Sequence, residues 1–320
     1  MTAPRAVTVS APSRLHFGLM SFGQGHDRQF GGVGVMIDRP RFVLTARTSG
    51  HFAVGGASSE VVTKYAKRVL AHLNHADFLA EIAVQQAPRP HVGLGTGTQI
   101  GLSVAKAMHA LLGLESIDSI RLAKVAGRGA RSAVGTHGFQ DGGLIFDEGK
   151  QCDEEVGRMG ARIELPPSWR FMLIIPNDSE GLSGTHERHA FEQLPPIPQA
   201  ASQTLREIAA GEIIPAARAA NIDAFGDAVY RYGHLAGTCF ATQQHGPYAT
   251  EMTQHIVDGL RASGIRGVGQ SSWGPTVFAV VRESEVEGAV ELARGLLPAG
   301  DSQIVVAAPD ATGAVMEIDR

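Results

Sequence analysis

Cysteine is scarce in this chain, whose 320 residues include only Cys152 and Cys239. Two distant cysteines provide neither a disulfide framework nor the paired spacing of a cysteine-rich metal site. The sequence also lacks a stretch of about 18 consecutive apolar residues, so we expect no membrane-spanning helix. Residues 1–9 have neither the apolar core nor the cleavage pattern of a signal peptide. Together these absences predict a protein of the reducing cytoplasm that does not act at a membrane.

An excess of positive charge is missing as well. Lysine and arginine number 28 against 32 aspartates and glutamates, which gives a formal net charge of -4. Because nucleic-acid binding needs a strongly basic surface, we do not expect a nucleic-acid partner. Glycine, in contrast, is abundant: the 39 glycines form clusters rather than a repeat. Such clusters are typical of tight turns and of loops that approach a ligand closely.

The hydrophobic pattern indicates an α+β protein with two domains. Short strands come first, with expected breaks at Pro12 and Pro40, and helices such as 61–73 and 99–112 are interleaved unevenly. The Pro166-Pro167-Ser168 segment is the best boundary, which predicts an N-terminal domain of residues 1–166 and a C-terminal domain of residues 167–320. The second domain has the order strand, helix, strand, strand, helix, strand, which is typical of a ferredoxin-like fold.

The most informative motif is a glycine-rich run that precedes a helical pattern ending at Leu112. A glycine loop that opens a helix leaves backbone N–H groups unpaired at the positive end of the helix dipole, which predicts a site for an anion such as phosphate. The run has no lysine for a Walker loop and lacks the Rossmann glycine spacing. A flexible turn before a helix is the alternative. The candidate phosphate contacts are Gly93, Gly95, Thr96, Gly97, Thr98 and Gln99.

Arg14 and His16 would share one face of a predicted strand, with Leu15 and Phe17 on the other face. Arginine and histidine side by side suit a phosphorylated or carboxylated ligand. A solvated sheet edge is the alternative interpretation.

Asp141 lies among glycines in the run 138–143, where its carboxylate could reach a substrate without steric obstruction. It is a candidate Mg²⁺ ligand or catalytic base. A hairpin turn is the alternative, because Asp-Gly is a strong turn signal.

Two further polar clusters occur in the second half. The loop with Gln270, Ser271 and Ser272 lies between two predicted strands, and it has more polar side chains than a simple hairpin requires. We therefore expect it to face a ligand. His186 and His189 are spaced one residue short of the His-Glu-x-x-His zinc motif, which favours a surface helix over a metal site, although a ligand role for Glu187 remains open.

Taken together, the clusters resemble the superfamily of small-molecule kinases that includes galactokinase, homoserine kinase and mevalonate kinase (the GHMP kinases). The similar segments are residues 11–16, 93–98, the surroundings of Asp141, and 269–276. The resemblance covers most of the chain. It implies an N-terminal domain like the second domain of ribosomal protein S5 and a ferredoxin-like C-terminal domain.

The differences from the kinases point to one branch of that superfamily. Gly97 replaces the serine that helps to hold Mg²⁺ on ATP, and His16 replaces an asparagine, which argues against ATP-dependent phosphoryl transfer. The same changes make the chain similar to β-ribofuranosylaminobenzene 5′-phosphate synthase. The matching segments are 13–19, 31–34, 93–99, 141–143 and 270–275.

This resemblance implies a decarboxylating phosphoribosyltransferase of methanopterin biosynthesis. The implied substrates are 5-phosphoribosyl-1-pyrophosphate and 4-aminobenzoate or a related benzoate, with Mg²⁺ as cofactor and a homodimer as the assembly. Asp141 would serve Mg²⁺ or the developing cation. Arg14 and His16 would contact the ribose phosphate or the carboxylate, and His16 or Ser271 is favoured for the carboxylate. Arg28, Arg128 and Arg131 are further phosphate candidates. A GHMP-type kinase and a non-catalytic metabolite binder are the alternatives.

Overall fold

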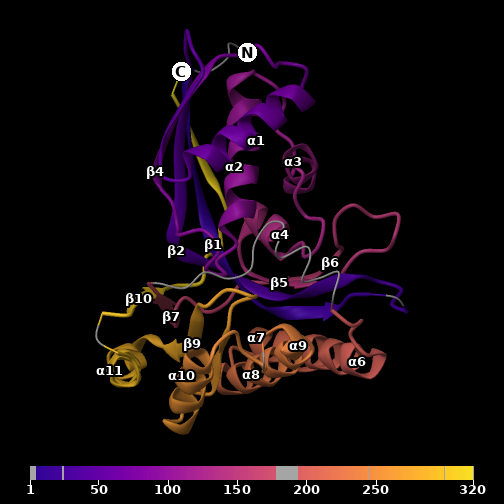
Figure 1. Cartoon of the computed structure of the whole chain (residues 1–320), viewed down its shortest axis with the longest axis vertical. Helices are drawn as coiled ribbons and strands as arrows, with labels where there is room; N and C mark the ends of the chain where they lie inside the picture. The colour runs from indigo at the N-terminus through magenta and orange to yellow at the C-terminus, as the bar shows by residue number, and fades with distance from the viewer. Residues whose placement is uncertain (1–4, 24, 178–193, 245, 299, 320) are drawn as a thin grey trace.

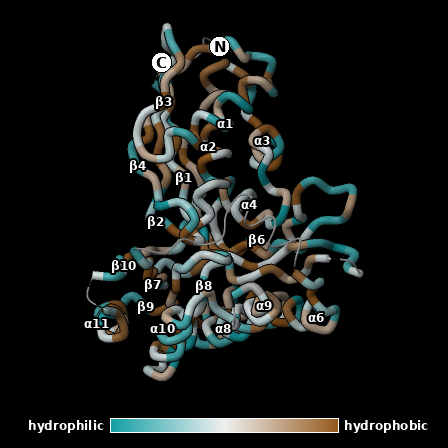
Figure 2. The backbone as a smooth tube through the Cα atoms, viewed as in Figure 1, coloured by the Kyte–Doolittle hydropathy of each residue, from teal (hydrophilic) through white to brown (hydrophobic). Residues whose placement is uncertain are grey.

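The computed structural model describes residues 5–23, 25–177, 194–244, 246–298 and 300–319. Two sheets with helices packed against them follow one another along the long axis of the molecule (Figure 1). Hydrophobic residues recur along the strands and helices of both halves (Figure 2). In the described part of the chain, no helix has the length and apolar character needed to cross a bilayer.

The first sheet has seven strands, in the order β11-β1-β2-β4-β3, and β5 and β6 extend it from β2. The expected breaks at Pro12 and Pro40 do not occur, because β1 and β2 continue through these prolines as long strands. The pairing of β1 with β2 instead shifts its register between Ala11 and Ser13 and between His16 and Gly18. The strands are β1 (Ala6–Ser21), β2 (Phe30–Thr48), β3 (Ala53–Gly56), β4 (Ala80–Gln86), β5 (Leu144–Asp147), β6 (Met159–Ile163) and β11 (Val315–Asp319).

Helices cover one face of this sheet, namely α1 (Ser59–His72), α2 (Thr96–Leu111), α3 (Ser119–Ala126) and α4 (Val134–Asp141). Helix α1 buries Val62, Ala66, Val69 and Leu70, a helical spacing that gives it one apolar stripe. Helix α2 lies between α1 and the sheet and is buried on most sides. Its amino-terminal end is therefore held rigidly at the position where the glycine-rich run ends.

The second sheet has the order β10-β7-β9-β8 with antiparallel neighbours. This order and the helices between the strands confirm the predicted ferredoxin-like arrangement. The strands are β7 (Trp169–Pro176), β8 (Gly267–Gln270), β9 (Val277–Arg282) and β10 (Ser302–Ala307). The helices are α6 (Gln199–Ile208), η1 (Ala209–Ile213), α7 (Ile214–Arg218), α8 (Ile222–Thr238), α9 (Ala241–Gln244), α10 (Glu251–Ala262), η2 (Glu283–Glu285) and α11 (Val286–Leu296).

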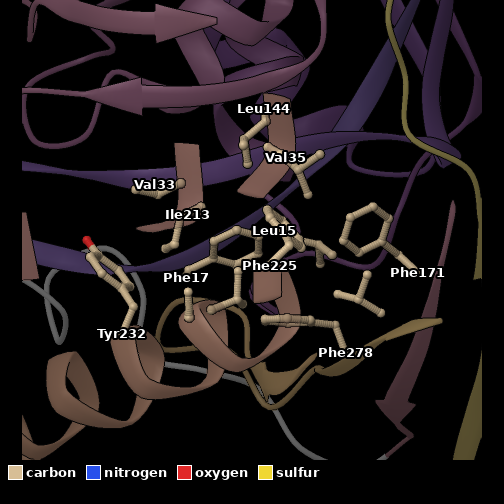
Figure 3. Close-up of a cluster of buried hydrophobic side chains, with 14 of the residues drawn as sticks. Leu15, Phe17, Val33, Val35, Leu144, Phe171, Ile213, Phe225, Tyr232 and Phe278 are labelled. Carbon is tan, nitrogen blue, oxygen red and sulfur yellow. The ribbon is translucent and has the colours of Figure 1, made fainter. Parts of the chain in front are cut away.

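One apolar core joins the two halves. Leu15 and Phe17 of β1 extend from the first sheet toward Phe225 of α8 and Phe278 of β9 (Figure 3). The rings of Phe17 and Phe278 have centroids 5.1 Å apart. The boundary predicted at Pro166 lies between the two sheets, but the halves on either side of it share this core.

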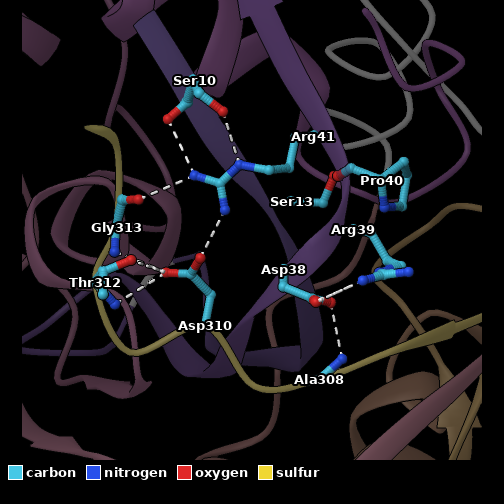
Figure 4. A network of polar contacts seen from close by, with 10 residues as sticks. All are labelled: Ser10, Ser13, Asp38, Arg39, Pro40, Arg41, Ala308, Asp310, Thr312 and Gly313. Carbon is cyan, nitrogen blue, oxygen red and sulfur yellow. Dashed lines mark hydrogen bonds and ion pairs between the residues drawn. The ribbon is translucent and has the colours of Figure 1, made fainter. Parts of the chain in front are cut away.

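A polar network ties residues 310–319 to the first sheet (Figure 4). Arg41 Nη1 lies 2.7 Å from Asp310 Oδ2, and the Asp310 side chain is only 5 % exposed. Gly313 N donates to Asp310 Oδ1 over 2.7 Å, and β11 then pairs antiparallel with β1. The chain beyond β10 therefore returns to the first sheet, although the predicted second domain, residues 167–320, includes it.

Candidate active site

A cavity lies between β1, the segment that follows α3, the end of α8 and the end of β8. Its volume is about 220 Å³, and it is open to solvent on one side. The polar and cationic part of its lining consists of Arg14, His16, Thr98, Arg128, Arg131 and Ser132. The apolar part includes Leu19, Ala236, Phe240, Pro247 and Trp273. The cavity can therefore hold an anion beside an apolar ring.

The cationic side brings together three of the four predicted arginines. Arg14 comes from β1, whereas Arg128 and Arg131 follow α3. Arg128 Nη2 donates to Thr98 Oγ1 over 3.0 Å, and Arg14 Nη1 donates to Gly93 O over 2.7 Å. Among the described residues, no aspartate or glutamate lines this cavity. The field inside is therefore positive and favours a polyanion.

The start of α2 strengthens that field. Gly95 is the N-cap residue with a left-handed φ of 72°, and no described side chain caps this end. A methyl group built on Gly95 would lie 2.7 Å from Arg14 Cγ, so only glycine lets the arginine cross the helix start. Arg14 and Arg128 therefore lie beside the positive end of the α2 dipole, since the Cβ positions of Gly95 and Gly97 are closest to these two side chains.

The glycine-rich run itself lines the cavity only through Thr98. Thr96 and Gln99 are buried, and Gln99 Nε2 donates to Gly135 O over 3.1 Å. Gly93 packs against the second half of the chain, because a methyl group there would lie 2.2 Å from Ser271 O. Gly97 has open space around it, since a methyl group added there would lie 3.9 Å from Arg128 Nη2. Gly93 and Gln99 thus shape the loop rather than the cavity surface.

The loop after β8 divides into residues that reach the cavity and one that does not. Gln270 and Ser272 line it, but Gln270 uses both ends of its amide internally, accepting from Ala249 N and donating to Ser272 O. Ser271 is fully buried; its hydroxyl donates to Gly93 O over 2.7 Å and accepts from His16 N over 3.0 Å. Ser271 therefore joins β1 to the glycine-rich run and is not available to a carboxylate.

His16 lies in the cavity wall with both ring nitrogens engaged. Nε2 is 2.8 Å from Ser132 Oγ, and Gly18 N donates to Nδ1 over 3.2 Å. Burial and, secondarily, the charge of Arg14 hold the pKa of His16 well below its ordinary value. The imidazole is therefore neutral at pH 7.

Asp147 is a buried carboxylate bonded to the cavity-lining Ser132, and sequence reasoning missed it. It ends the apolar strand β5, is fully buried, and accepts from Ala133 N at 2.6 Å, Gly149 N at 2.9 Å and Ser132 Oγ at 3.3 Å. Burial raises the pKa of Asp147, while these donors act in the opposite direction. A charged residue closing the strand Leu-Ile-Phe-Asp was the one signal available, but its partner Ser132 could not be read from it.

Asp141 does not lie with the other predicted site residues. It is the exposed last residue of α4 and does not line the cavity; Arg162 Nε donates to its backbone oxygen over 3.0 Å. The reason is that residues 134–141 form a helix instead of a glycine-rich turn. At roughly 1.5 Å per residue, eight residues carry Asp141 about 12 Å from the Ser132 end.

The described residues do not fit a protein-held Mg²⁺. Hard divalent cations take oxygen ligands, chiefly carboxylates. No carboxylate lines the described cavity, and no group of three histidine, cysteine, aspartate or glutamate side chains in the described chain is arranged for a metal ion. Asp147, the nearest buried carboxylate to Ser132, is committed to protein donors.

Two other candidates lie elsewhere. Arg28 pairs with Glu154 at 2.9 Å and donates to Gly149 O, and it does not line the cavity. The His186, Glu187 and His189 cluster lies outside the described residues.

Sequence comparison with known proteins shows which family this chain belongs to. The chain is 30 % identical over 284 residues to a β-ribofuranosylphenol 5′-phosphate synthase of Archaeoglobus fulgidus, covering 84 % of this chain and 86 % of that protein. The chain belongs to the β-ribofuranosylphenol 5′-phosphate synthase family. A synthase of the same name from Methanothermobacter thermautotrophicus is 29 % identical and matches 88 % of this chain and 91 % of its own. The predicted family relationship is thereby confirmed.

This chain has a GHMP-kinase-like fold. Residues 60–144 match the family model for the GHMP kinases N terminal domain. A mevalonate diphosphate decarboxylase structure from Staphylococcus aureus superposes with a TM-score of 0.69 at 15 % identity, covering 98 % of both chains. A homoserine kinase structure from Cytophaga hutchinsonii gives 0.68 at 14 % identity, covering 99 % of both. At these identities the likeness concerns the fold alone, and it confirms the GHMP-kinase-like prediction.

Proposed function

We propose that this protein is a decarboxylating phosphoribosyltransferase that joins 5-phosphoribosyl-1-pyrophosphate to a 4-substituted benzoate. The products would be a ribofuranosyl arene 5′-phosphate, CO₂ and pyrophosphate. The name of the relatives supports a ribosyl arene phosphate as product. One observation carries the proposal: a single cavity is lined by three arginines, by Thr98 from the first turn of α2, and by the aromatic rings of Phe240 and Trp273.

The arginine side suits the donor. Its phosphate and pyrophosphate groups bear several negative charges, and Arg14, Arg128 and Arg131 line the same cavity. As the bond from the ribose anomeric carbon to pyrophosphate breaks, the electron pair leaves with the pyrophosphate. Fixed positive charges favour that separation more than they favour the intact donor, and one such contact is worth about 3 kcal/mol of barrier.

The apolar side suits the acceptor. Phe240 and Trp273 meet edge to face with ring centroids 5.1 Å apart, and Ala236 and Pro247 add apolar surface to the same cavity. The ring carbon that bears the carboxylate would form the new bond to the ribose carbon. The carbon–carboxylate bond then breaks, its electron pair restores aromaticity, and CO₂ leaves. An amino or hydroxyl group opposite the carboxylate supplies electron density to the attacking carbon.

The role expected for His16 and Ser271 in holding the benzoate carboxylate receives no support from the geometry. Both are engaged with protein groups, and Ser271 does not reach the cavity. A carboxylate held against apolar groups instead would be poorly solvated, which favours its loss as neutral CO₂. No step requires Mg²⁺ held by the protein, and a magnesium complex of the donor would arrive as substrate.

The test is a four-arm incubation with 5-phosphoribosyl-1-pyrophosphate and carboxyl-labelled 4-aminobenzoate or 4-hydroxybenzoate, each with and without ATP. Labelled CO₂ released without ATP is the expected result, and the comparison of the two acids identifies the preferred acceptor. ATP consumption with a phosphorylated acceptor would support a GHMP-type kinase, whose fold this chain shares. Donor binding without release of CO₂ in any arm would support a metabolite-binding protein.

The remaining expectations belong to the same proposal. We propose that the product enters methanopterin biosynthesis in the cytoplasm and that the protein acts as a homodimer. Sedimentation analysis of the purified chain measures the assembly, and loss of the methanopterin-type carrier on deletion of the gene tests the pathway.

A further inference from the structure

We propose that His16 is a neutral hydrogen-bond bridge that positions the cavity wall carrying Arg131 and Ser132, and that it neither gives nor takes a proton during the reaction. The kinetic part of this inference rests on the proposed function. The state of the imidazole can be measured without any turnover.

The hydrogen bonds of His16 fix its tautomer. Gly18 N–H can only donate, so Nδ1, 3.2 Å away, must accept. A neutral imidazole whose Nδ1 accepts carries its proton on Nε2. Nε2 lies 2.8 Å from Ser132 Oγ, and the ring therefore donates to the serine hydroxyl.

The bridge continues through Ser132 to Asp147. The serine hydroxyl donates to Asp147 Oδ2 over 3.3 Å, and it accepts from His16 Nε2 and from Val134 N at 3.2 Å. One donor and two acceptor positions are all that a hydroxyl has. The order is imidazole, hydroxyl, carboxylate, whereas in a serine–histidine–aspartate triad the imidazole lies in the middle. The Ser132 proton thus points to a carboxylate, and His16 does not activate the hydroxyl as a nucleophile.

The surroundings keep the imidazole neutral. His16 is buried, and the charged residues on its own strand and across the cavity wall are Arg14, Arg128 and Arg131, all positive. The one carboxylate of the bridge, Asp147, lies beyond Ser132 and accepts three protein donors. Burial and the Arg14 charge both lower the pKa of His16.

The position of His16 explains what the bridge holds. Its backbone N donates to Ser271 Oγ and its backbone O accepts from Ser272 N, while its side chain reaches the segment after α3. One residue therefore joins β1, the loop after β8 and the arginine-bearing segment. Gly32 leaves room for the ring, because a methyl group there would lie 2.9 Å from His16 Cε1.

The first experiment is ¹⁵N NMR of histidine-labelled wild-type protein. We expect the His16 shifts of a neutral Nε2–H tautomer, unchanged between about pH 5.5 and 8, where an ordinary histidine titrates. Titration of His16 within that range, or an Nδ1–H tautomer, overturns the inference. This measurement stands even if the wild type shows no synthase activity, in which case the proposed function fails separately.

The second experiment compares H16Q with H16F. The glutamine amide can donate from nearly the same position as Nε2–H, whereas phenylalanine keeps the ring shape without nitrogens. We expect H16F to raise the KM for 5-phosphoribosyl-1-pyrophosphate and to lower kcat/KM at least about 100-fold, and H16Q to restore kcat/KM to within about tenfold of wild type. Loss of a general acid or base instead costs roughly 10²–10⁴-fold in any variant without an ionisable group. A loss greater than tenfold in folded H16Q overturns the inference. Thermal unfolding of each variant identifies any that fails to fold, and the NMR result then decides alone.

Discussion

Replacement of Gly95 by alanine tests the architecture of the anion site. Gly95 has a φ of 72°, and an alanine in this left-handed region costs about 1–2 kcal/mol. The added methyl group would also lie 2.7 Å from Arg14 Cγ, so the arginine must move. We therefore expect the free energy of unfolding to fall by at least about 1 kcal/mol. If Arg14 contacts the pyrophosphate, kcat/KM for the donor falls about 100-fold, which corresponds to roughly 3 kcal/mol.

Gly97→Ala is the matched control for stability. Gly97 lies in the first turn of the same helix, its φ is not left-handed, and an added methyl group would meet nothing closer than 3.9 Å. Alanine there should leave the free energy of unfolding unchanged or raise it by up to about 1 kcal/mol. Urea unfolding of the two variants provides the comparison. Equal stabilities for Gly95→Ala and wild type would refute the conclusion that Arg14 and the helix start require glycine at this position.

Four further predictions follow from individual contacts. Arg128→Gln should lower kcat/KM for the donor about 100-fold and have little effect on the KM of the benzoate. Arg162→Gln is the control, because Arg162 does not line the cavity, and it should change neither constant. If Arg128→Gln affects both substrates equally, Arg128 does not contact the donor selectively. Arg41→Met removes the ion-pair partner of the buried Asp310 carboxylate and should lower the free energy of unfolding by about 3 kcal/mol. Arg47→Met breaks the exposed pair with Glu81 and should lower it by less than about 1 kcal/mol. Urea unfolding measures both values. Because burial lowers the pKa of His16 in the folded protein, the unfolded chain binds a proton at His16 at a higher pH than the folded protein does. The free energy of unfolding should therefore rise with pH up to about 6.5, by up to about 1.4 kcal/mol per pH unit. H16Q should lack this contribution, and the same dependence of unfolding free energy on pH in H16Q and wild type would contradict the prediction. Calorimetry with MgCl₂ alone should show no stoichiometric binding to the free protein, and a bound ion would disprove the conclusion drawn from the carboxylate-free cavity wall.

The sequence predicted the parts of the fold that depend on local pattern. The helix expected at 61–73, the helix after the glycine-rich run and the strand–helix order of the second half were anticipated because apolar spacing is a local signal. Helix α4 was missed, since two glycines and the Asp-Gly turn signal obscure it. Gly138 is tolerated in that helix because it packs against Met36 of β2, a contact between segments far apart in sequence.

Single residues that stand out locally can be singled out from the sequence, whereas hydrogen-bonded pairs cannot. Arg14, His16 and Thr98 were singled out in three separate interpretations, and the structure places all three in the lining of one cavity. Asp147 accepts hydrogen bonds from Ala133 N and Ser132 Oγ, which lie 14 and 15 positions away, and His16 bonds through Nε2 to Ser132, which is 116 positions away. Such long-range hydrogen bonds leave no periodic trace in a single sequence. Asp141 had a clear local signal, but the helix that it ends carries it away from the cavity.

The pairing of β11 with β1 has a consequence for how this protein is made. The first sheet gains its outer strand from residues 315–319, and Asp319 O accepts a hydrogen bond from Arg5 N. During synthesis on the ribosome, the edge of β1 that pairs with β11 has no partner strand until the other described elements have been made. Unpaired strand edges invite association with other chains. The growing polypeptide is therefore exposed to mispairing at the edge of β1 that β11 later covers.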